Sequence, residues 1–272
     1  MRKRGNSRAA DSYALSSYDR VLYYYNSYAE LRCARARIFS ARFGRVPGLR
    51  CDVTTPPRCD TVVLTANHTF LSSALHVQRS GVTLTIEGGA MLAGKDGAIK
   101  QCEAEADWRG WCSFLTVDAE RDFVLNGSGT LAGGGKHGEH WSTLHVRSTV
   151  GVRLGDGLRI YCTNSWWCTV MHNASAVHAT QLFIDGKTGR DGLDLVNSRD
   201  ILVEDSRIEG SDDGLCFKTQ ADDGLGAWPA RNVPVRRSYL SSECCNAIQF
   251  GSRTEVDMSE FSFEDLVIGS GE

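Results

Sequence analysis

One short pattern recurs in the second half of the chain and limits the folds open to it. Asp191-Gly192-Leu193-Asp194-Leu195 reappears 22 residues later as Asp213-Gly214-Leu215-Cys216-Phe217. A looser copy, Asn246-Ala247-Ile248-Gln249-Phe250, follows after a further 33 residues. The longer interval contains an insertion with Gly and Pro at about 222–231. A period near 22 with an insertion at one corner is typical of a solenoid in which each repeat forms one coil.

Within each copy the apolar residues alternate with the others, as in Leu193 and Leu195 or Ile248 and Phe250. Alternation with period two predicts a strand with one buried face. Runs of this kind recur about every ten residues from Thr61 onward, separated by Gly, Ser and Asn and not by helical segments. Parallel strands joined by short turns predict an all-β fold, a parallel β-helix.

Stacking of the coils brings three carboxylates together. Neighbouring strands of a sheet lie about 4.8 Å apart, so Asp191 and Asp213 are expected on adjacent coils, with Asp212 beside them. Like charges at this distance raise at least one carboxyl pKa and destabilise a fold that makes no use of them. Asp-Gly and Asp-Asp-Gly are also common turn formers, and aspartate clusters of β-helical lyases bind calcium. A turn-forming role and a calcium site therefore both stay open for these aspartates.

The charge of the chain is divided unevenly. Residues 1–50 contain eleven Lys and Arg against three Asp and Glu, whereas the remainder contains 19 against 30. A basic leader on an acidic body indicates two different parts. We therefore expect residues 1–55 to form a poorly ordered basic extension, and residues 56–272 to form the β-helix. The final coil stops in mid-pattern without a polar cap, so we expect the β-helix to be incomplete at its C-terminus.

Cysteines and glycosylation sequons favour an extracellular protein. The chain has ten cysteines, and the pairs Cys51/Cys59 and Cys102/Cys112 enclose short loops that a disulfide could close. Three Asn-x-Ser/Thr sequons occur, at Asn67, Asn126 and Asn173. No signal peptide is recognisable after Met1, and no run of 18 apolar residues predicts a membrane span.

Five segments, in chain order, resemble the polygalacturonase-type glycoside hydrolases of family 28. Gly189-Arg190-Asp191-Gly192 is similar to the N-T-D-G motif of that family, and Ser211-Asp212-Asp213 to its G-D-D motif. The other three are Ser80–Gly94, Asn126–Trp141 and Asn164–Ile184. This resemblance implies a right-handed parallel β-helix that hydrolyses pectin, a polysaccharide of the plant cell wall. The sequence departs from the family at Asn246, where the G-H-G motif has histidine, and the R-I-K motif would lie beyond Glu272.

The resemblance also implies an inverting mechanism. Asp212 would protonate the glycosidic oxygen as the general acid, while Asp191 and Asp213 would hold and activate the attacking water. A general acid needs a raised pKa, which two neighbouring carboxylates could supply. We therefore predict Asp191, Asp212 and Asp213 as the catalytic residues.

Four residues are candidates for substrate binding: Lys218, Asn246, Arg190 and Arg253. Lys218 shares the strand parity of Asp212 and is expected to point outward near it, where it could bind an anionic sugar or neutralise the aspartates. Asn246 could bind a sugar hydroxyl or belong to an asparagine ladder. Trp166 and Trp167 could offer a stacking face for a sugar or fill the core.

We predict a monomeric enzyme that cleaves α-glycosidic bonds of pectin-like polymers, with a polysaccharide as its partner. No cofactor, metal, nucleic acid or membrane is expected. A neutral or mixed backbone stays open as substrate, because the body of the chain is acidic. The alternatives are a catalytically inactive carbohydrate-binding β-helix and a calcium-dependent polysaccharide lyase.

Overall fold

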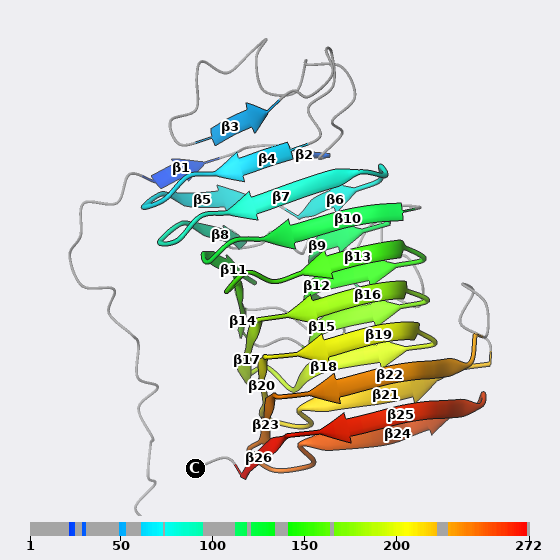
Figure 1. The fold of residues 1–272 in the computed structure, drawn as a ribbon. Helices are drawn as coiled ribbons and strands as arrows, with labels where there is room; N and C mark the ends of the chain where they lie inside the picture. The colour runs from blue at the N-terminus through cyan, green and yellow to red at the C-terminus, as the bar shows by residue number, and fades with distance from the viewer. Residues whose placement is uncertain are drawn as a thin grey trace, which may run out of the picture.

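The coils of the chain stack into three sheets, here A, B and C, which enclose one continuous core (Figure 1). The computed structural model describes residues 22–24, 29–30, 49–52, 61–72, 74–94, 112–118, 121–133, 141–163, 166–221 and 228–270. From residue 61 onward, successive strands belong to sheets C, A and B in turn, and all of their pairings with one another are parallel; one antiparallel pair lies at the N-terminal end of sheet C. The predicted pairs Cys51/Cys59 and Cys102/Cys112 each include a cysteine, Cys59 or Cys102, that lies outside the described residues.

Sheet A has nine strands in the order β1 (Leu22–Tyr24), β5 (Thr69–Ser72), β8 (Met91–Gly94), β11 (Thr130–Ala132), β14 (Arg159–Thr163), β17 (Phe183–Thr188), β20 (Arg207–Gly210), β23 (Tyr239–Ser242) and β26 (Val267–Ser270). Sheet B has eight, β2 (Ala29–Glu30), β6 (Leu75–Val77), β9 (Cys112–Val117), β12 (Trp141–Arg147), β15 (Trp167–His172), β18 (Asp191–Val196), β21 (Leu215–Thr219) and β24 (Ile248–Thr254). Sheet C has nine, β3 (Leu49–Asp52), β4 (Thr61–Leu64), β7 (Val82–Ile86), β10 (Arg121–Asn126), β13 (Val150–Leu154), β16 (Ser175–Thr180), β19 (Arg199–Glu204), β22 (Ala230–Arg236) and β25 (Met258–Glu264).

The predicted parallel β-helix is confirmed, and so is the 22-residue register of its central coils. Leu193 pairs with Leu215 and Leu195 with Phe217 between β18 and β21. These side chains are at most 1% exposed, and they belong to a core cluster supplied by all three sheets. The alternation in sequence therefore corresponds to an interior that every coil helps to fill.

Three short strands, β1, β2 and β3, come from residues 1–55 and pair with the sheets, β3 in the antiparallel sense. One observation differs from the expectations. Phe250, expected on the buried face, is 45% exposed. It stacks on Phe217 at 4.8 Å between ring centroids, but β24 is the last strand of sheet B and carries no further coil.

Serine side chains fix the corners between sheets C and A. Ser206 Oγ accepts a hydrogen bond from the backbone of Leu182 at 3.1 Å, and Ser238 Oγ accepts one from Ser206 at the same distance. Each hydroxyl also donates to a carbonyl of its own coil, two residues back in the chain. Because each serine satisfies a buried amide of the preceding coil, the stack continues without unpaired backbone groups at these turns.

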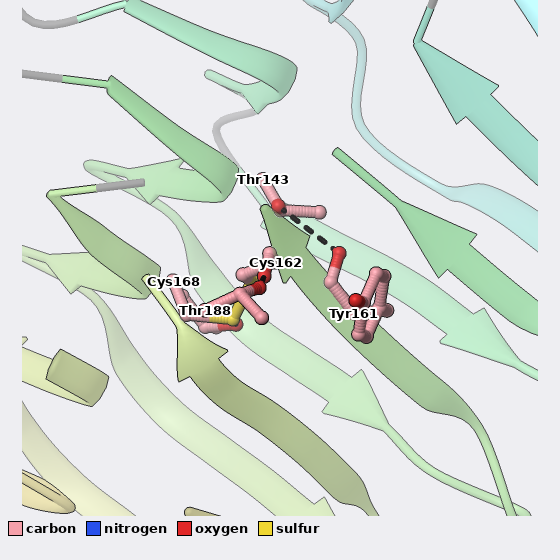
Figure 2. Close-up of a disulfide and its surroundings, with 6 residues drawn as sticks. Thr143, Tyr161, Cys162, Cys168 and Thr188 are labelled. Carbon is pink, nitrogen blue, oxygen red and sulfur yellow. Dashed lines mark hydrogen bonds between the residues drawn. A yellow bond between two sulfur atoms is a disulfide. The ribbon is translucent and has the colours of Figure 1, made fainter. Parts of the chain in front are cut away.

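One disulfide joins Cys162, in β14, to Cys168, in β15 (Figure 2). Both cysteines are completely buried. Thr188 Oγ1 donates a hydrogen bond to the Cys162 carbonyl and so ties the next coil to this corner. The six-residue spacing of these two cysteines did not indicate a disulfide in the sequence. The bond joins the end of β14 to the start of β15, next to Trp167.

Candidate active site

The predicted catalytic aspartates lie along one corner of the coil, where sheet A strands lead into sheet B strands. This A–B corner consists of the turns 189–190, 211–214 and 243–247. Glycine follows the aspartate because the coils approach closely here. A Cβ at Gly192 would lie 2.6 Å from the Gly214 carbonyl oxygen and 2.9 Å from Ile208 Cγ2. The repeated Asp-Gly is therefore a packing requirement as well as a source of carboxylates.

Asp191 and Asp213 meet on adjacent coils, as the register predicts. Their carboxylates and the thiol of Cys216 lie within 4.8 Å of one another. The Asp213 backbone amide donates to Asp191 Oδ1 at 3.4 Å, and the Asn246 amide donates to Asp213 Oδ1 at 3.0 Å. The two carboxylates are therefore oriented by the backbone of the following coil.

Asp212 stands apart from this pair and is more accessible, with a side chain 23% exposed against 7% for Asp191. Its Oδ2 accepts hydrogen bonds from both Nε of Arg190, at 2.9 Å, and Nη2 of the same residue. The Arg190 guanidinium also lies 4.1 Å from the centre of the Trp166 ring. Arg190, predicted to bind substrate, is thus paired with the predicted general acid.

The expectation of a raised pKa for Asp212 is wrong for this structure. Partial burial by itself would raise the pKa of Asp212, but hydrogen bonds from Cys245 and Arg190 and the positive charges of Arg190 and Lys218 together lower it. The neighbouring carboxylates alone would raise the pKa, but the Arg190 guanidinium opposes them. Displacement of the Arg190 side chain by a substrate would remove two of the hydrogen bonds that lower the pKa of Asp212.

Lys218 does not face solvent, which corrects the expected position. It is on the opposite side of its strand from Phe217, as parity predicts, but its side chain is only 5% exposed. Its Nζ donates to Asp191 Oδ2 at 3.0 Å and to Asp194 Oδ1, and lies 4.5 Å from the centre of the Trp167 ring. Of the two roles predicted for Lys218, the geometry favours neutralisation of the aspartates.

Asp194 was missed as part of the site, although the first repeat contains it. It is completely buried, and burial raises its pKa well above the ordinary value, with Lys218 opposing that effect. Burial alone would lower the pKa of Lys218, but the charges of Asp194 and Asp191 outweigh this and raise it. These directions favour a neutral carboxyl group on Asp194 beside a charged Lys218.

A test of this charge assignment is the pH dependence of stability in Asp194→Asn. The contribution of Asp194 to the free energy of unfolding should be complete below the ordinary carboxyl pKa of about 3.9. It should decline as the pH rises through the higher pKa that Asp194 has in the folded protein. Asparagine cannot ionise, so the difference in unfolding free energy between wild type and variant should move against the wild type with rising pH, by at most about 1.4 kcal/mol per pH unit. Urea unfolding from pH 4 to pH 8 measures it. A difference that moves the other way would show that Asp194 is ionised in the fold.

The remaining predicted residues have ordinary neighbours. Asn246 is exposed and donates from Nδ2 to Gln249 Oε1 at 3.0 Å, so an asparagine ladder does not form at this position. Arg253 lies in the second half of β24, away from the A–B corner, and donates to Gln220 Oε1 at 3.3 Å. Trp166 and Trp167 are half-buried and face Arg190 and Lys218, so they do not fill the core, and a stacking face for a sugar stays a prediction.

The sequons and hydropathy give limited information on location. Asn67 is exposed, Asn126 is held by Thr85 and Asp156, and Asn173 is 1% exposed and closed to a glycan. Among the residues described, no helix is sufficiently long and apolar to cross a membrane.

Comparison with known proteins gives matches at the level of structure. No protein-family model matches the sequence, and no curated protein matches it. A polygalacturonase from Erwinia carotovora ssp. carotovora superposes with a TM-score of 0.61 and 19% identity, over 77% of this chain and 62% of the other. A family 28 exopolygalacturonase from Yersinia enterocolitica gives a TM-score of 0.51 and 13% identity, over 76% and 60%. The chain therefore spans less than two thirds of the length of these two proteins, and it shares with them the fold of the right-handed parallel β-helix.

Proposed function

We propose that this protein is a glycoside hydrolase that cleaves α-glycosidic bonds of pectin-like polysaccharides with inversion. The observation that carries the proposal is the arrangement of three aspartates at the A–B corner: two close together and buried to different degrees, and one beside them and more accessible. Hydrolysis with inversion needs a carboxyl group that protonates the leaving oxygen and a carboxylate that activates water on the opposite side of the bond. The fold shared with two polygalacturonases supports the same reaction class.

Asp191 and Asp213 take the part of the base in this proposal. Lys218 Nζ donates a hydrogen bond to Asp191 Oδ2 at 3.0 Å, and backbone amides hold both aspartate side chains in position. A water molecule bound between two such carboxylates would lose a proton as it attacks the anomeric carbon. The deprotonated water supplies the new C–O bond, and the proton passes to the carboxylate.

Asp212 takes the part of the general acid. Its exposure allows it to reach a glycosidic oxygen, and Arg190 must turn away to release Oδ2. Arg190 is half-exposed, so it can move without disrupting the core, and its guanidinium could then bind a carboxylate of the polymer. Substrate binding and activation of the acid would thus occur together. An extracellular location, which plant-wall polymers as substrate would require, remains a prediction.

The rival activities predict different products. A calcium site is not favoured, because Ca²⁺ takes six to eight oxygen ligands, whereas Asp191 and Asp213 share their cluster with a thiol, and a lysine contacts Asp191.

Incubation with polygalacturonate and with rhamnogalacturonan, followed by reducing-end and ultraviolet assays, distinguishes a hydrolase, a lyase and an inactive binding protein. We expect new reducing ends, no unsaturated product and no effect of a chelator. Ultraviolet-absorbing products would indicate a lyase, and binding without new ends an inactive carbohydrate-binding protein.

A further inference from the structure

Two adjacent cysteines lie beside the proposed general acid and have no part in the proposed reaction. Cys244 and Cys245 occupy the turn between β23 and β24, one coil after Asp212, and both are exposed. The amide of Cys244 donates to the Ser211 carbonyl at 3.2 Å, and that of Cys245 to Ser242 Oγ at 2.8 Å. The turn is therefore held against the Asp212 turn by its backbone, which fixes the origin of both thiol side chains.

The donor atoms of this turn converge with those of Asp212. One carboxylate oxygen of Asp212 and the sulfur atoms of Cys244 and Cys245 all lie within 4.8 Å of one another. In a tetrahedral zinc site with bonds of about 2.0–2.3 Å, neighbouring ligand atoms lie roughly 3.5–4 Å apart. Small rotations of the two exposed cysteine side chains would close the remaining distance. Arg190 bonds to Oδ2 alone and leaves Oδ1 for another partner.

The composition of this cluster selects a particular class of ligand. Two thiolates and one carboxylate match zinc and its softer relative cadmium, and they leave one of four tetrahedral positions open for water. Two thiolates, the Asp212 carboxylate and the Arg190 guanidinium carry a total charge of −2, which a divalent ion neutralises. We propose that Cys244, Cys245 and Asp212 form a binding site for a thiophilic divalent cation. A bound ion would also block hydrolysis by occupying Asp212, an effect that rests on the proposed function.

A second group of donors, Asp191, Asp213 and Cys216, is not an equivalent site. Cys216 is completely buried, and Lys218 Nζ already lies 3.0 Å from Asp191 Oδ2. A cation there would have to displace a buried ammonium group and leave it beside a like charge, which is strongly unfavourable. The exposed turn of Cys244 and Cys245 imposes neither requirement, so the proposal is restricted to that turn.

Cadmium titration of the reduced full-length protein tests the binding site directly. Cd²⁺ should bind with one equivalent at this site and produce the ultraviolet charge-transfer absorption of cadmium thiolate. Cys244→Ser and Cys245→Ser should each lose about half of that absorption, and the double variant should lose nearly all of it. Cys112→Ser, which alters a buried cysteine outside both clusters, should titrate as the wild type does. Unchanged absorption in the double variant would overturn the proposal.

Inhibition by the metal is measured separately from metal binding. The absence of inhibition can then be told apart from the absence of any hydrolysis. Saturating Cd²⁺ or Zn²⁺ should reduce polysaccharide hydrolysis to the level of Asp212→Asn, a fall of about 10²–10⁴-fold. The Cys244→Ser/Cys245→Ser variant should keep its own metal-free rate of hydrolysis when the metal is added. Equal inhibition of that variant would overturn the blocking role. A protein that binds Cd²⁺ through these thiols but never hydrolyses the polymers would contradict the proposed function while the metal site stands.

Discussion

Replacement of Asp212 with asparagine is expected to lower hydrolysis about 10²–10⁴-fold, the usual contribution of a general acid. The amide has nearly the same shape but cannot donate the proton that the leaving oxygen needs. Because the side chain is partly exposed and at the corner of a coil, the fold should survive the change. Reducing-end release from polygalacturonate measures the rate, and the unfolding midpoint in urea reports on the fold.

A matched control is Asp205→Asn, which removes another aspartate that is paired with an arginine. Asp205 lies on the turn after β19, away from the A–B corner. Its side chain is 42% exposed and accepts a hydrogen bond from Arg237. This variant should hydrolyse at the wild-type rate. If Asp212→Asn and Asp205→Asn were equally active, Asp212 would not be the acid, and a turn-forming role for the Asp-Asp-Gly segment would be the better interpretation.

Replacement of Lys218 with methionine is expected to destabilise the fold by about 3–5 kcal/mol, since removal of one partner leaves buried charge without compensation. Asp191 and Asp194 both contact the Lys218 ammonium, and both are buried. The remaining folded protein should also hydrolyse more slowly, because Asp191 would lose the ammonium group that holds its carboxylate in position. Urea unfolding and the rate of reducing-end release measure the two effects.

Two further variants separate charge from packing at Lys218. Lys187→Met removes a lysine that is 42% exposed and 3.6 Å from Glu209, and should change stability by at most about 1 kcal/mol. The double variant Lys218→Met/Asp191→Asn should recover part of the lost stability, because the carboxylate that loses its ammonium partner is then replaced by an uncharged amide. A Lys218→Met variant as stable as the wild type would show that the buried pairing contributes little.

Strand periodicity predicts both the coil and the position of its carboxylates. A 22-residue repeat with alternating Leu193, Leu195, Leu215 and Phe217 has one consistent arrangement, in which identical positions stack in register. Asp191 and Asp213 therefore had to meet, and Asp212 had to lie beside them. These are consequences of strand periodicity, which depends only on the order of residues along the chain.

The contacts of each charged side chain depend on the tertiary structure. Strand parity turned Lys218 away from the core, but the structure shows it enclosed between Asp191, Asp194 and Trp167. Arg190 pairs with Asp212 and stacks on Trp166. Trp166 lies two residues before Cys168, which the disulfide joins to Cys162. Phe250 is exposed although it has core parity, since burial requires a further coil on top of it. Periodicity fixes the side of a strand on which a residue lies, whereas burial and pairing depend on segments that are distant in the sequence.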